Sequence, residues 1–183
     1  MDGSISLSKK IAFTALFATL CCIGTLLVSI PIPGGHGYFN VGDVFVLLSA
    51  WFLGGVYGPI AAAVGSALAD LLSGYALYAP ATFIIKGLDA FVAYLVCLFF
   101  KKLIKKERLD FLPRALSAIV GEAVMVAGYF LYESILYGFA GAVLSIVGNL
   151  LQGACCLTLA TALFACLYPI KPLRKFFPTL IKE

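Results

Sequence analysis

The chain has 183 residues, of which 62% are hydrophobic and 12% are charged, and its mean hydropathy is +1.05. A typical soluble domain is about half apolar and about a quarter charged, so a water-soluble fold of this length has no place for so much apolar surface. The net charge of +4 comes from basic residues in short clusters between apolar runs. That distribution fits the charge bias of membrane loops and argues against a nucleic-acid partner.

Six apolar segments are predicted to be transmembrane helices, because a span needs about 20 apolar residues and proline, glycine and charge clusters separate the segments. The second and third are short, so they are either extended by their glycine-rich flanks or do not cross the full bilayer. A stripe of small residues in the third, Ala61, Gly65 and Ala69, favours close packing within the chain. In chain order the segments are 11–30, 41–53, 60–72, 80–101, 115–137 and 142–168.

The basic residues predict the orientation. Lys9 and Lys10 precede the first segment, six basic residues separate the fourth from the fifth, and four follow the sixth. With six spans, all three clusters fall on one side, which the positive-inside rule assigns to the cytoplasm. The prediction is therefore one all-α membrane domain over residues 1–183, with both termini cytoplasmic and only Lys86 of the basic residues elsewhere.

Charged side chains inside the apolar segments point to a site, because a charge near the bilayer centre costs about 2.5 to 3.5 kcal/mol and usually faces a cavity or a partner. Lys86 and Asp70 are predicted about 9 Å and about 6 Å below the outer boundary, at 1.5 Å per residue. They are the preferred ion pair, for ligand contact or for stability alone. Asp43 is expected to begin the second helix, where an acid suits the dipole. Glu122 is assigned a packing or coupling role, and Asp89 none.

Polar and aromatic residues of the outer half outline a predicted pocket. Glu133 lies in the fifth segment, and Asn149 and Gln152, three residues apart in the sixth, share one helix face. Hydrogen bonding between helices is an alternative role for these two amides. Aromatic walls with a few polar groups suit a small heteroaromatic ligand. The outer loops add His36, Tyr38, Asn40, Tyr75 and Tyr78.

Catalysis finds little support in the sequence. It has one histidine and neither H-E-x-x-H nor G-x-S-x-G, so a catalytic metal site or a histidine-based triad cannot be assembled. It also lacks the phosphate-binding G-x-x-x-x-G-K-[ST], so any ATP hydrolysis requires another chain. The six cysteines show no C-x-x-C spacing. A non-enzymatic protein without cofactor or metal is predicted.

Four blocks of sequence carry a family resemblance. They are GYFNVGD at 37–43, SALADLLSGY at 66–75, YAP with IKGL within 78–88, and GNLLQG at 148–153. In this order and spacing the chain resembles the substrate-binding S components of energy-coupling factor (ECF) vitamin transporters. It is most similar to the branch for riboflavin, hydroxymethylpyrimidine and pyridoxine-type substrates.

The resemblance implies a six-helix subunit of the bacterial inner (cytoplasmic) membrane that binds its vitamin under the loop joining the first two helices. The expected vitamin is hydroxymethylpyrimidine, pyridoxine or a similar small heteroaromatic molecule, with riboflavin as the alternative. The expected partners are a transmembrane T component and two ABC-type ATPases, which hydrolyse the ATP. In the family an Ala-x-x-x-Ala motif on the first helix contacts the T component. The nearest matches here are Thr14 with Ala18 and Ala15 with Thr19.

Two other functions are open at this stage. A self-sufficient ion-coupled transporter could use Asp70, Lys86 or Glu133 as a proton or sodium relay, but the paired broken helices typical of such proteins are not evident. In a membrane scaffold or accessory subunit, the outer polar cluster would be incidental. Vitamin binding without an ion gradient distinguishes the S component from both.

Overall fold

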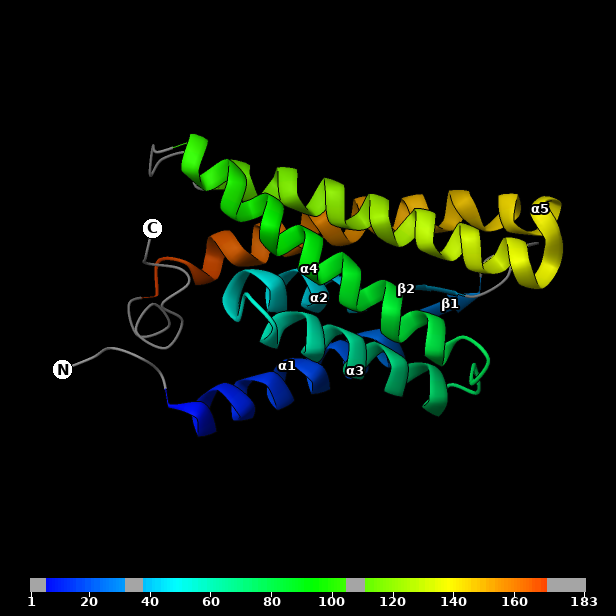
Figure 1. The fold of residues 1–183 in the computed structure, drawn as a ribbon, viewed down its shortest axis with the longest axis horizontal. Coiled ribbons are helices and arrows are strands. Elements are labelled where there is room, and N and C mark those ends of the chain that lie inside the picture. Colours follow the sequence, from blue (N-terminus) through cyan, green and yellow to red (C-terminus); the bar gives the residue numbers. More distant parts are fainter. Residues whose placement is uncertain (1–5, 32–37, 105–110, 171–183) are drawn as a thin grey trace.

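The computed structural model describes residues 6–31, 38–104 and 111–170 (Figure 1). His36 and the glycine-rich stretch around it therefore lie outside the described residues. Within these ranges the chain forms five helices and one antiparallel β-hairpin. In order they are α1 (Leu7–Leu27), β1 (Ser29–Pro31), β2 (Tyr38–Asn40), α2 (Gly42–Phe52), α3 (Tyr57–Leu72), α4 (Ala79–Leu103) and α5 (Phe111–Leu167).

The predicted fifth and sixth segments are joined in α5. Gly138 has a non-helical backbone, with φ of 75° and ψ of 166°, and the chain reverses direction in this region (Figure 1). A positive φ is open to glycine because it has no Cβ to clash with the backbone. The halves on either side, 111–137 and 139–167, each exceed the length of about 20 residues that a span needs. The boundary predicted between the fifth and sixth segments, after residue 137, is therefore in the right place. The chain turns there at Gly138 without a separate loop.

α2 is an interior helix. Ten of its eleven residues are buried, and at 1.5 Å per residue it is about 16 Å long, roughly half the hydrocarbon thickness of a bilayer. Trp51 anchors it, because its indole N–H donates to the Ser117 hydroxyl at 3.0 Å and its ring meets the edge of Phe164. Among the described residues, α1, α4 and α5 are the three helices long and apolar enough to span a membrane. The predicted all-α membrane fold is thus confirmed. The six predicted separate helices are not, because the described residues form five helices.

The first helix ends earlier than predicted. α1 stops at Leu27, and the following residues pair as a short hairpin in which Ser29 lies opposite Asn40. Pro31 disfavours a helical backbone at the residue before it, so the chain is extended here. The hairpin was not predicted, and it holds Tyr38 and Asn40 in an ordered strand.

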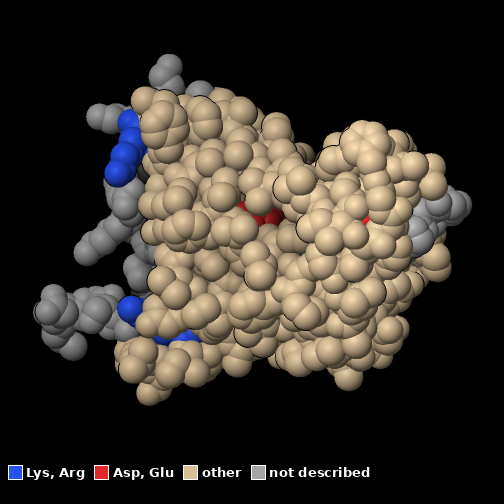
Figure 2. Space-filling view, turned by 45° about the vertical axis from the view of Figure 1, so that its right-hand side comes forward, with Lys and Arg blue, Asp and Glu red and all other residues tan. Residues whose placement is uncertain are grey.

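The surface is divided by charge. Lys9 and Lys10 begin α1, and Lys101 and Lys102 end α4, at the same end of the molecule (Figure 1). Figure 2 shows Lys and Arg at that end and a wide uncharged face, on which acidic atoms are visible only in recesses. Large apolar side chains lie exposed on the helices; Ile135 is 82% accessible. Such an apolar band is typical of a surface that faces lipid.

α1 packs on α3 through small residues. Ala61 and Ala69 are buried, and an added Cβ at Gly65 would lie 2.8 Å from the Cys21 Cβ and closer still to the Ala18 carbonyl oxygen. The predicted stripe therefore serves packing within the chain. Ala18, one of the four predicted partner-docking residues, is partly covered by this contact.

The other three predicted docking residues lie along α1 as well. Ala15 and Thr19 are exposed, and Thr14 is partly buried. The hydroxyls of Thr14 and Thr19 donate to the carbonyls of Lys10 and Ala15 in their own helix. The pair on the free face of α1 is therefore Ala15 with Thr19.

Gly65→Ala should lower the thermal unfolding midpoint of the detergent-purified protein, since overpacking a tight contact costs about 1 to 3 kcal/mol. Gly87→Ala is the matched control, because its new Cβ would meet Ala63 at an ordinary 3.4 Å. Equal midpoints for both variants would contradict the close approach of α1 and α3.

Candidate functional site

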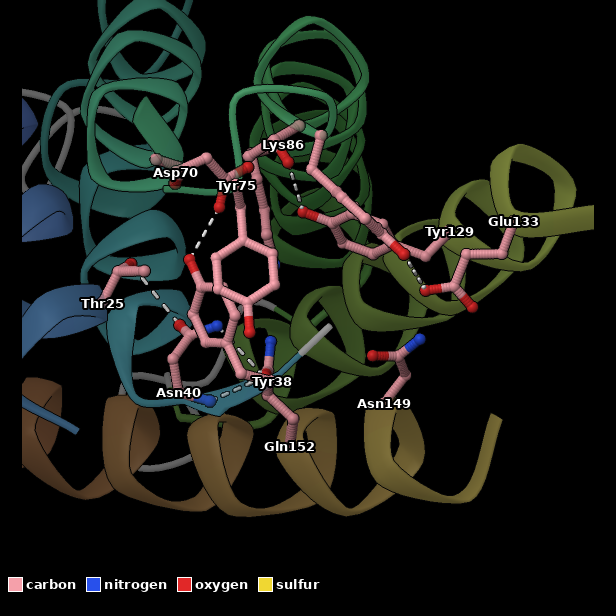
Figure 3. A pocket seen from close by; sticks show the side chains of 13 residues that line it. Thr25, Tyr38, Asn40, Asp70, Tyr75, Lys86, Tyr129, Glu133, Asn149 and Gln152 are labelled. Carbon is pink, nitrogen blue, oxygen red and sulfur yellow. Dashed lines mark hydrogen bonds between the residues drawn. The ribbon is translucent and has the colours of Figure 1, made fainter. Parts of the chain in front are cut away.

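A pocket of about 450 Å³, part of it open to solvent, lies between the hairpin, α3, α4 and both halves of α5 (Figure 3). Nine of the ten predicted binding residues line it, the exception being His36, which is not described. The lining residues are Thr25, Tyr38, Asn40, Ser66, Asp70, Tyr75, Tyr78, Thr82, Lys86, Tyr129, Glu133, Asn149 and Gln152.

Tyrosines form the walls of the pocket. The rings of Tyr38 and Tyr75 are 4.8 Å apart between centroids, and Tyr78 meets Tyr75 nearly edge-on at 6.1 Å. Tyr129 lies on the α5 side, with the Lys86 ammonium 5.4 Å from its ring centroid. Flat apolar faces with polar tips can stack on a planar ligand and hydrogen-bond its edge.

The preferred ion pair of the sequence analysis is wrong. Lys86 donates to the Asp43 Oδ1 at 2.5 Å, and both side chains are almost completely buried. Asp70 instead accepts a 2.6 Å hydrogen bond from the Tyr38 hydroxyl. Similar depth suggested that Asp70 and Lys86 would pair, but α2 brings Asp43 directly to the lysine. Asp43 therefore has a structural role far beyond favouring a helix dipole.

Amides extend this ion pair into the hairpin. The Gln152 amide nitrogen donates to the second oxygen of Asp43 at 2.6 Å, and its carbonyl oxygen accepts from the backbone N–H of Asn40 at 2.8 Å. The Asn40 side chain in turn accepts from the Gly42 N–H at 2.9 Å and, more weakly, from the Thr25 hydroxyl at 3.5 Å. Gln152 and Asn40 therefore use part of their hydrogen-bonding capacity within the protein. For Gln152 this matches the alternative role of hydrogen bonding between helices.

Asp70 is prepared to accept a further hydrogen bond. Burial, followed by the hydrogen bond to Asp70, raises the pKa of the Tyr38 hydroxyl, so this hydroxyl stays protonated and donates. The other carboxylate oxygen of Asp70 and the hydroxyl of Ser66 are buried without a partner among the described residues. Ser66 is four residues before Asp70, hence on the same face of α3. A buried polar group left unsatisfied is costly, so both suit a ligand that completes them.

The two halves of α5 bring Glu133 and Asn149 to the same pocket. Glu133 is 2% exposed and accepts a hydrogen bond from the Tyr78 hydroxyl at 3.3 Å. Asn149 is 8% exposed, and its amide points into the cavity (Figure 3). The reversal at Gly138 is what places these residues opposite each other.

Sequence reasoning missed several residues of the site. Thr82 and Tyr129, whose hydroxyls are 3.0 Å apart, line the pocket, as do Ser66 and Thr25. Three of these lie four residues before a predicted site residue, a spacing that places them on the same helix face. Helical periodicity applied to the charged residues would have found them. Thr25, at the end of α1, carries no comparable signal.

Fold and pocket together define a multi-pass membrane protein that can hold a small molecule. A family model described as "ECF-type riboflavin transporter, S component" matches residues 6–169. The chain therefore belongs to the S components of ECF-type transporters, which are transport subunits of the cell membrane and not enzymes. The predicted family, its vitamin-transport role and its membrane location are confirmed.

The chain is also similar to two curated proteins and to one solved structure. The chain is 38% identical over 130 residues to an "Uncharacterized protein in gap 3'region" of Pyrococcus woesei, covering 71% of this chain and 82% of that one. It is 27% identical over 145 residues to the "Thiamine precursor transporter HmpT" of Lactococcus lactis subsp. cremoris (strain MG1363), covering 79% and 78% of the two chains. A solved structure titled "Structure and mechanism of the S component of a bacterial ECF transporter" has a TM-score of 0.66 at 19% identity, with 91% and 99% covered. This last likeness shows that the fold is shared.

Asp43→Asn should destabilise the protein by about 3 to 5 kcal/mol, because it leaves the Lys86 ammonium buried without its counter-charge. Adding Lys86→Met to this variant should recover much of the loss, since the double variant then leaves no uncompensated charge buried at either position. Chemical unfolding in detergent of the two single variants and the double variant measures the coupling. Additive losses would show that the two side chains do not depend on each other.

Proposed function

We propose that this chain is the vitamin-binding S component of an ECF-type importer for hydroxymethylpyrimidine, pyridoxine or a similar small heteroaromatic molecule. The observation that carries the proposal is the convergence of costly polar side chains from α3, α4 and both halves of α5 on one pocket. Asp70, Lys86 and Glu133 are all nearly inaccessible there. Such groups are retained inside a membrane protein when they serve a function.

The charges of the pocket support a ligand rich in hydrogen-bond donors. Asp70 and Glu133 are acceptors when ionised, while the cation Lys86 is held by Asp43. A ring with an exocyclic amine or hydroxyl groups can donate to these acceptors and stack on Tyr38 or Tyr75. The relative named a thiamine precursor transporter supports a pyrimidine. Riboflavin is the alternative, supported by the description of the family model.

The assembly and the orientation belong to the same proposal. The chain forms a single membrane domain of six membrane-embedded helical segments, of which the short α2 extends only part of the way across, with its basic end and both termini in the cytoplasm. A transmembrane T component docks on α1, where Ala15 and Thr19 are exposed, and two ABC-type ATPases hydrolyse ATP. A self-sufficient ion relay is less well supported, since Asp70, Lys86 and Glu133 are bonded to Tyr38, Asp43 and Tyr78.

Titration calorimetry of the detergent-purified protein, without any ion gradient, tests this function with hydroxymethylpyrimidine, pyridoxine and riboflavin. Asn149→Ala should weaken binding of the preferred vitamin roughly tenfold, the loss of one ligand hydrogen bond in a buried site. Thr158→Ala is the matched control. It lies on the same half of α5 but is exposed and bonds only its own helix, at the Ala154 carbonyl.

Three outcomes contradict the proposal. Equal affinity of the Asn149 variant and the wild type would place the ligand elsewhere. Binding that depends on added sodium ions or on the proton concentration would favour the ion-coupled transporter. No binding of any of the three compounds would show that the proposed vitamin class is wrong. Tightest binding of riboflavin would keep the family role and replace the proposed vitamin.

A further inference from the structure

Two buried carboxyl groups lie outside the pocket. Asp89 on α4 is 0% exposed, and Glu122 on the first half of α5 is 5% exposed. All four of their carboxyl oxygens are shielded and have no hydrogen-bond partner among the described residues. Neither side chain lines the pocket. An isolated carboxylate in such surroundings is so costly that the group usually binds a proton instead.

Glycines leave the space that these two groups occupy. A Cβ added at Gly121 would lie 2.5 Å from the Asp89 Oδ1 and 3.1 Å from the Ala93 Cβ. A Cβ added at Gly153 would lie 3.2 Å from the Glu122 Oε2. The helices therefore approach closely around both carboxyls, and any side chain at these two positions would compete with them.

Charge balance in this region is incomplete. Asp89 and Glu122 both interact electrostatically with Lys86 and Asp43. Lys86 is already balanced by Asp43 at 2.5 Å and also interacts with Asp70 in the pocket, so among the described residues this one cation faces four acids. Two thiols also interact electrostatically with these acids: Cys21 on α1 with Asp89, and Cys156 on α5 with Glu122. Tyr129 on α5 faces Lys86 and Asp43.

We propose that Asp89 and Glu122 form a proton-binding site beside the ligand pocket, and that ligand affinity falls when its protons are lost. With both carboxyls protonated, the buried network of four groups is neutral. Once ionised, the two acids compete with Asp43 for Lys86. The hydrogen bonds from Gln152 to Asp43 and from Asn40 to Gln152, which shape the pocket floor, then loosen.

Protons suit these residues better than a metal ion. The described residues contain no group of three or more His, Cys, Asp or Glu arranged to hold a metal. Buried carboxyls are known to keep their protons up to about pH 8 to 9. The effect is therefore expected from about neutral pH upward. The link to affinity rests on the proposed vitamin binding, but the proton site itself does not.

Infrared spectroscopy of the purified protein tests the site without any ligand. Protonated carboxyls have a carbonyl stretch that carboxylates lack and that shifts in D₂O. This band should lose intensity in Asp89→Asn and again in Glu122→Gln, at neutral pH. An unchanged band in both variants would overturn the proposal.

Calorimetry tests the link to the pocket, with hydroxymethylpyrimidine as the probe. The affinity of the wild type should fall about tenfold or more between about pH 7 and about pH 9. The double variant Asp89→Asn with Glu122→Gln carries neutral isosteres of the protonated acids. The affinity of this double variant should match that of the wild type at neutral pH within about twofold. As the pH rises, it should fall less than the affinity of the wild type.

Other results would overturn the link. An equal decline in the double variant would assign the pH dependence to the pocket itself. A large loss of affinity in the double variant at neutral pH would show that the two acids act as carboxylates, because the substitutions would then have removed two negative charges. Affinity that depends on sodium, compared with choline at fixed pH, would replace the proton by a metal cation. If hydroxymethylpyrimidine fails to bind and pyridoxine binds, pyridoxine replaces it as the probe. If neither binds, the proposed vitamin class is wrong, and the infrared result still decides the proton site.

Discussion

The buried ion pair of Lys86 and Asp43 holds the polar interior of this protein together. In a medium of low dielectric each charge is tolerated only because the other compensates it, and removing one partner leaves the other stranded. The pair joins α4 to α2, and Gln152 carries the connection to α5 and, through Asn40, to the hairpin. A short helix that cannot cross the bilayer by itself is thereby fixed at the centre of the bundle. The pocket forms on top of this network, with walls of tyrosine and two further acids.

Much of the site could be predicted from the cost of charge in a membrane. Asp70, Lys86 and Glu133 interrupt apolar runs, and such residues face the interior, so all three were placed in the pocket before the fold was known. The partner of Lys86 could not be predicted in the same way. Distance along a helix gives depth, whereas the direction in which a side chain points depends on how the helices pack. Asp43 looked like an acid at a helix start, and only the position of α2 makes it the counter-ion.

The parts of the fold that were missed depend on contacts remote in sequence. The strand at Ser29–Pro31 is too short to show a pattern of its own and forms by pairing with Tyr38–Asn40. The reversal within α5 needs one glycine at positive φ, a conformation that no hydropathy profile detects. Two acids next to the pocket, which have no hydrogen-bond partner in the described part of the chain, follow the same physics as the ion pair. Asp89 and Glu122 have no cation of their own among the described residues, and we infer that they become neutral by binding protons. The ligand affinity of the pocket then depends on pH.

An experimental structure with the preferred vitamin bound would test the account most directly. We expect the ring against the tyrosine walls, with one of its donors within hydrogen-bond distance of Asp70 or Glu133. Lys86 should still contact Asp43, because the account makes this pair part of the framework. A vitamin bound outside this pocket, or a Lys86 that has left Asp43 to bind the ligand, would contradict it.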